Sequence, residues 1–88
     1  KYVTKAVMLC KNEEFQKFLE QKNMEEGTYS WGMGNQEIEC SNALKSLIGL
    51  SSRADLKLEG DAYDQKRRDL DNLIREFQDY YDKNAQGI

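Results

Sequence analysis

The chain has 88 residues, of which 39% are hydrophobic and 33% charged, and its formal net charge is -3. This length is too short for two ordinary domains, so we expect a single domain over residues 1–88 with a modest core. The slightly acidic balance disfavours nucleic-acid binding through neutralised phosphates, and the absence of histidine removes the commonest general base and the commonest metal ligand.

The first third of the chain predicts two helices. Residues 1–10 fit a helix through the spacing of Val3 and Val7, although the same residues also favour a strand, and we prefer the helix. Asn12 then has the side chain of a helix cap, and we expect the second helix to end near Asn23. Three apolar residues share a face of that helix: Phe15, Phe18 and Leu19.

Residues 24–35 carry three glycines and no clear period, which predicts a loop or a short hairpin. Tyr29, Trp31 and Met33 lie within this stretch. Exposed aromatic residues on an adaptable loop are typical of interaction hot spots, whereas inward-facing ones would close a small core. Both interpretations stay open, and the three residues are our candidate partner-binding site.

A third helix and a short helical turn follow. Asn35 can cap the helix and Gly49 can end it in the left-handed conformation, while Ser52 and Asp55 have the spacing of a capping box. Gly60 should end the turn that the capping box begins. The expected apolar stripe of the third helix comprises Ile38, Ala43, Leu44, Leu47 and Ile48.

The last helix should run from Asp61 to about Lys83, because apolar residues recur there at three- and four-residue steps. Opposite charges four residues apart predict ion pairs on its outer face, namely Asp64 with Arg68, Asp71 with Arg75 and Asp79 with Lys83. The chain is therefore expected to be mainly α, a compact bundle of about four helices. A long amphipathic helix could also pair with a copy of itself, which would give a homodimer.

The sequence contains no recognisable catalytic set. Cys10 and Cys40 lack the spacing of a metal or redox site and the histidine that would activate a nucleophile, so we expect buried free thiols. Most acidic residues stand at helix starts or opposite a cation, which predicts a solvated, paired surface. We therefore expect no enzyme, no cofactor and no metal. With no long apolar run and no signal-peptide pattern, we also expect no membrane span and a cytoplasmic location.

Two features favour an alternative, nucleic-acid-binding function. The first is the corner at Ser51, Ser52 and Arg53, which resembles a helix-hairpin-helix module but lacks its second glycine and one residue of the turn. The second is the basic cluster of Lys66, Arg67 and Arg68, whose field is offset by neighbouring aspartates.

Three segments, CKNEEFQKFL, IECSNALKSLIGLSSRADL and DLDNLIREFQDYY, together resemble small uncharacterised proteins from the early regions of tailed phages and prophages. The resemblance implies a bacterial host cytoplasm and a role beside replication, recombination or counter-defence proteins. It supplies no catalytic residue. The resulting hypothesis is a non-enzymatic accessory protein that binds another protein, of unknown identity, in the host or phage DNA-transaction machinery.

Overall fold

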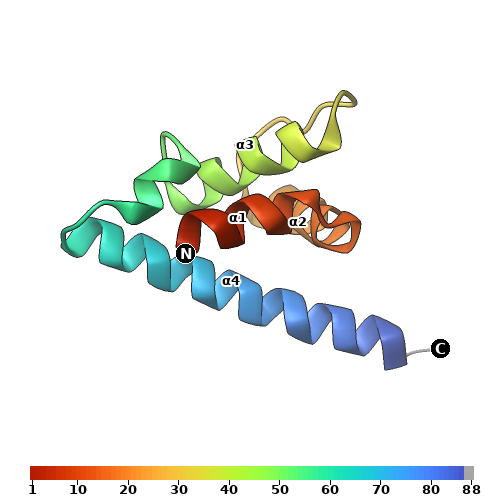
Figure 1. Ribbon diagram of the computed structural model, residues 1–88. Coiled ribbons are helices and arrows are strands. Elements are labelled where there is room, and N and C mark those ends of the chain that lie inside the picture. The colour runs from red at the N-terminus through yellow and green to blue at the C-terminus, as the bar shows by residue number, and fades with distance from the viewer. Residues whose placement is uncertain (87–88) are drawn as a thin grey trace.

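The structure is a computed structural model that describes residues 1–86, with side chains described through residue 83. It confirms the mainly α class, and the described part of the chain contains no strand. Four α-helices and one 3-10 helix follow one another: α1 (Tyr2–Lys11), α2 (Glu13–Glu26), α3 (Gln36–Ile48), η1 (Arg53–Lys57) and α4 (Asp61–Gln86). α4 runs beneath the other helices, and its C-terminal end extends beyond them (Figure 1).

The first two helices meet at Asn12, whose side chain accepts hydrogen bonds from the amides of Glu14 and Phe15 at 2.8 and 3.3 Å. These bonds satisfy amides that have no partner inside the helix, which is why α2 begins there as predicted. Because only Asn12 separates α1 from α2, the chain turns sharply between them.

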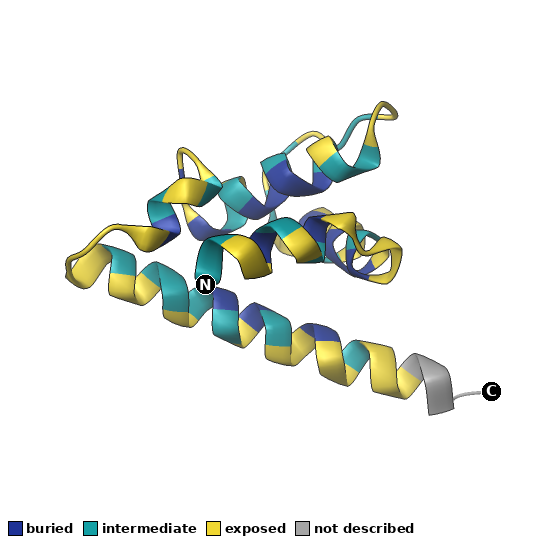
Figure 2. Cartoon of the chain, in the orientation of Figure 1, coloured by how far each residue is buried: buried dark blue, intermediate teal, exposed yellow. Residues whose placement is uncertain are grey.

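The core gathers where the four α-helices and η1 meet, and the buried faces of the helices point inward in Figure 2. Its aromatic part joins α2 to α4: the rings of Phe15 and Phe77 lie edge to face with centroids 5.2 Å apart, and Phe18 lies 5.4 Å from Tyr80. Aromatic pairs at such spacings stabilise a core beyond the area that they bury. This cluster fixes α4 along α2.

The corner between α3 and α4 follows the sequence prediction closely. Gly49 ends α3 at φ +84°, a left-handed conformation in which a Cβ atom would be strained. Ser52 and Asp55 form the expected capping box at the start of η1. Leu50 folds back and is buried, and Gly60, at φ +119°, precedes α4.

Two details predicted for α2 and α3 were wrong. α2 continues to Glu26 rather than ending near Asn23, because the first helix breaker is Gly27, where an added Cβ atom would overlap the Asn23 side chain. Ile38 does not belong to the buried stripe of α3: it lies in the first turn of the helix and is 56% exposed.

The charged side chains on the outer face of α4 interact with other residues than the predicted ones. Asp64 pairs with Arg67, three residues away, and Arg68 donates to the side-chain oxygen of Gln65 instead. Asp71 accepts a 2.9 Å hydrogen bond from the hydroxyl of Tyr2 on α1. The predicted i,i+4 ion pairs at Asp64 and Asp71 are therefore wrong, since closer partners compete for the same carboxylates.

Candidate functional site

The connection between α2 and α3, residues 27–35, is attached to the first turns of α3. One carboxylate oxygen, Oε1 of Glu39, accepts hydrogen bonds from the hydroxyl of Tyr29 at 2.9 Å and from the amide of Gly32 at 2.5 Å. On the α2 side, the buried Asn23 amide donates to the carbonyl of Tyr29 at 2.7 Å. The loop is thus held from both flanking helices.

Trp31 lies on the inner side of this loop. Its indole N–H donates to Oε1 of Gln36 at 2.7 Å, and the Gln36 amide donates in turn to the carbonyls of Gly32 and Gly34. Tyr29 and Trp31 are both half-buried and pack against the core. The sequence left open whether these rings face a partner or close the core, and in the structure both pack mainly inward.

Met33 behaves differently from the two aromatic residues. Its side chain is fully exposed, at 101% of the reference value, although the backbone beside it is fixed through Gln36 and Glu39. Ile38, in the first turn of α3, is exposed as well. The loop and the first turn of α3 therefore present apolar side chains from a hydrogen-bonded backbone, and we call Met33 and Ile38 the loop surface.

The predicted helix-hairpin-helix-like corner has little free hydrogen-bonding capacity. The amides of Ser51 and Ser52 donate to Oδ2 of Asp55 at 3.1 and 3.2 Å, and the amide of Ala54 donates to Oγ of Ser52. Amides at such a turn are the groups that would hold a phosphate. Here the chain's own carboxylate already occupies them and adds negative charge.

The three cations of the basic cluster on α4 point in different directions, two toward backbone carbonyls and one toward solvent. Arg67 donates to the carbonyls of Leu56 and Leu58 at 2.8 and 2.7 Å, so its guanidinium stabilises the end of η1. The Nζ atom of Lys66 donates a 3.4 Å hydrogen bond to the carbonyl of Ile48 at the C-terminus of α3, where a cation is favoured. Only Arg68 points to solvent as an exposed residue. The three cations do not form one outward patch.

Arg53, the third predicted corner residue, lies near the two cysteines, and its Nη1 atom is buried without a hydrogen-bond partner. Both thiols are buried and free, as expected. The neighbouring Cys40 thiol and the charge of Arg53 lower the pKa of Cys10 against the effect of burial. The same pairing with Cys10, together with burial, raises the pKa of Cys40 far above its usual value. Cys10 is therefore the thiol of the pair that ionises first.

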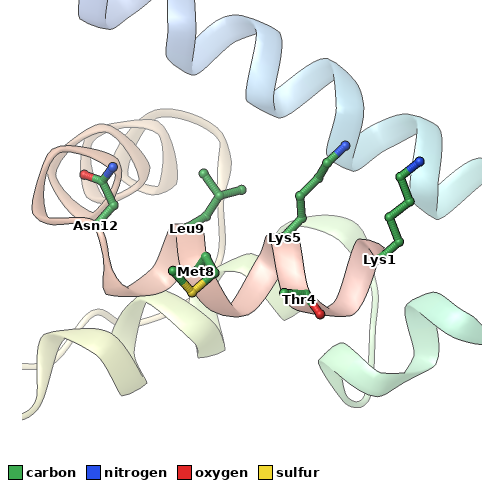
Figure 3. A pocket seen from close by; sticks show the side chains of 6 residues that line it. All are labelled: Lys1, Thr4, Lys5, Met8, Leu9 and Asn12. Carbon is green, nitrogen blue, oxygen red and sulfur yellow. The ribbon is translucent and has the colours of Figure 1, made fainter.

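A groove along α1 was not predicted from the sequence. It measures about 630 Å³ and is lined by Lys1, Thr4, Lys5, Met8, Leu9 and Asn12. Figure 3 shows Lys1 and Lys5 reaching toward α4, with Met8 on another side of the helix. The available signal was Met8, an apolar residue outside the spacing of the core-facing residues. It is 60% exposed.

Among the described residues, no group of three or more acidic, cysteine or histidine side chains could hold a metal ion, and no helix is long and apolar enough to cross a membrane. No protein-family model, curated protein or solved structure matches this chain.

Proposed function

We propose that this protein is a non-enzymatic protein-interaction module that binds its partner through the loop surface. The observation that carries the proposal is the pairing of a fully exposed Met33 with a hydrogen-bonded loop backbone. A side chain presented from an ordered backbone loses less conformational freedom on binding than one on a flexible loop. A methionine side chain also adapts to apolar partner surfaces of different shapes.

In this proposal Tyr29 and Trp31 support the site rather than contact the partner. Both rings are half-buried, and their polar atoms are engaged by Glu39 and Gln36. Their role is to set the position of the loop, while Met33 and Ile38 supply the contact. Replacing an aromatic residue would then weaken binding indirectly, by loosening the loop.

The resemblance to small early-region proteins of phages and prophages supports a setting for this activity. We propose an accessory protein that acts on DNA-transaction proteins of the host or the phage in the bacterial cytoplasm. The alternative is a nucleic-acid-binding module, which would use Ser51 to Arg53 and the cluster Lys66 to Arg68. The internal partners of these groups give it less support.

The test is an affinity capture from a bacterial lysate, with and without nuclease, using the tagged protein and its Met33→Ser/Ile38→Ser variant. We expect a protein that survives nuclease treatment and is lost, at least about tenfold, with the variant, since burying such side chains contributes about 1.5 to 3 kcal/mol each. Leu58→Ser is the matched control, because Leu58 is 41% exposed and belongs to the connection at the far end of the molecule.

Two results would contradict the proposal. Equal capture by the native chain and by the Met33→Ser/Ile38→Ser variant would remove the loop surface from the binding site. Captured nucleic acid, with proteins that vanish after nuclease, would favour the alternative; binding should then weaken with salt and with neutralisation of Arg53, Arg67 and Arg68.

A further inference from the structure

Charge is distributed unevenly between the two ends of the chain. Residues 1–12 contain three lysines and no acid, whereas residues 76–82 contain three acids, three aromatic residues and no base. The first segment forms α1 and its cap, and the second forms part of the C-terminal half of α4. The molecule therefore carries a basic helix and an acidic, aromatic helix end.

The basic helix also carries the groove described above. Core residues of α1 such as Ala6 and Cys10 are buried, while Met8 and the stems of Lys1 and Lys5 line the groove and the two lysines reach toward α4. Long lysine side chains bury their stems along apolar surface and keep the charge at the rim. An occupant of this groove should therefore combine an exposed apolar side chain with acidic neighbours.

The α4 end, residues 76–83, offers such groups on its exposed side, and Lys83 is its only base. Phe77 points inward to Phe15, and Tyr81 beside it is 48% exposed. Asp79 and Asp82 are exposed on the same helix end. At 1.5 Å per residue this end is about 12 Å long, which is within the roughly 15 Å length of α1.

The chain cannot place this end in its own groove. Contacts of Phe77 with Phe15 and Phe18 hold α4 on α2, and the end continues past the other helices (Figure 1). The N-terminus of α1, with Lys1, lies toward the opposite half of α4. The acidic end is thus available only to another molecule.

We propose that the α1 groove binds the α4 end of a second copy of this chain, in a reciprocal dimer. Each copy then contributes one groove and one helix end, which doubles a contact that would be small if made once. The pairing is independent of the proposed function at the loop surface. Because its charges lie at an exposed rim, the dimer should weaken as salt rises.

The test is sedimentation equilibrium of the native chain and of two charge-reversed variants at about 20 mM salt, where exposed charges act over about 20 Å. The groove variant is Lys1→Glu/Met8→Glu, which leaves Lys5 beside Asp71 untouched. The end variant is Asp79→Lys/Asp82→Lys. We expect the native chain to dimerise and each variant to self-associate at least about tenfold more weakly.

A mixture of the two variants gives the decisive result. The acidic groove of one variant faces the basic end of the other, while the remaining native groove and native end also match. An equimolar mixture should therefore recover the dimer. Lys11→Glu and Glu59→Lys are the controls, since both residues are exposed and neither belongs to the groove or to the α4 end. Circular dichroism checks that every variant keeps its helices.

The proposal is overturned by any of three results: a native chain that stays monomeric, a dimer that persists in both charge-reversed variants, or a mixture that remains monomeric. Loss of the dimer in Lys11→Glu as strongly as in the groove variant would also overturn it, because net charge rather than the groove would then control association.

Discussion

The two long connections of this molecule are built in opposite ways. The corner from Gly49 to Gly60 is made from local signals: a left-handed glycine, a capping box and a second positive-φ glycine. The loop of residues 27–35 contains no positive-φ residue and depends on side chains of the helices on either side. Local signals can be seen in a sequence, whereas hydrogen bonds between a loop and a neighbouring helix depend on the finished fold.

The largest expected effect comes from removing the carboxylate that holds the loop. Glu39→Ala leaves the hydroxyl of Tyr29 and the amide of Gly32 without their shared acceptor, and we expect a loss of about 2 kcal/mol in the free energy of unfolding. Urea unfolding followed by Trp31 fluorescence measures it. Glu39→Gln keeps an acceptor and should lose less than half as much; equal losses would mean that the loop is held in another way.

The free energy of unfolding should fall at alkaline pH because of the thiol pair, Cys10 and Cys40, which lies beside Arg53 of the corner. Above its ordinary pKa of 9.0, Cys40 loses its proton in the unfolded chain but keeps it in the fold. Unfolding is therefore favoured as pH rises, by at most about 1.4 kcal/mol per pH unit. Cys10, whose pKa is lowered, contributes the opposite slope until its thiol is also ionised in the unfolded chain, so the decline should emerge above pH 9.

Urea unfolding at pH 8, 9 and 10 tests this expectation. Tyr2, whose pKa is raised by its hydrogen bond to Asp71, contributes mainly above pH 10, outside the window. The Cys10→Ala/Cys40→Ala variant, which has no thiol, should lose the decline between pH 9 and 10. An unchanged decline would assign the effect to other groups.

The smallest expected effect is the difference in free energy of unfolding between alanine substitutions at a glycine of the corner and at a glycine of the loop. Gly49→Ala should cost about 1 kcal/mol, because a Cβ atom is strained at φ +84° and would also lie 3.1 Å from Nζ of Lys66. Gly34→Ala, in the loop, meets nothing within 4 Å and should change the free energy of unfolding little. Thermal unfolding of both variants compares them. A larger cost at Gly34 would contradict the contrast between the connections.

The sequence was sufficient for the helices, and for the corner, because caps and apolar periods are local. It was insufficient for the end of α2, where no residue before Gly27 stops the helix, and for Ile38, whose exposure depends on which turns other helices cover. The partners of Asp71 and Glu39 could not be predicted either. Both carboxylates bind groups from other elements, whose approach only the packed structure decides.

The candidate site was predicted in part. Tyr29, Trp31 and Met33 fall in one loop, as expected, but only the structure separates the two inward rings from the exposed thioether. The α1 groove needed the fold, because Met8 could not be assigned to solvent or core before the other helices were in place. Whether partners bind at these surfaces remains a prediction.

The three methionines of the sequence are at least 60% exposed, while both thiols are inaccessible. A mild peroxide should thus convert thioethers to sulfoxides at the loop surface, in the α1 groove and at Met24 without entering the core. Oxidative damage would then make the binding surfaces polar while leaving the helices folded, and methionine sulfoxide reductases could reverse it.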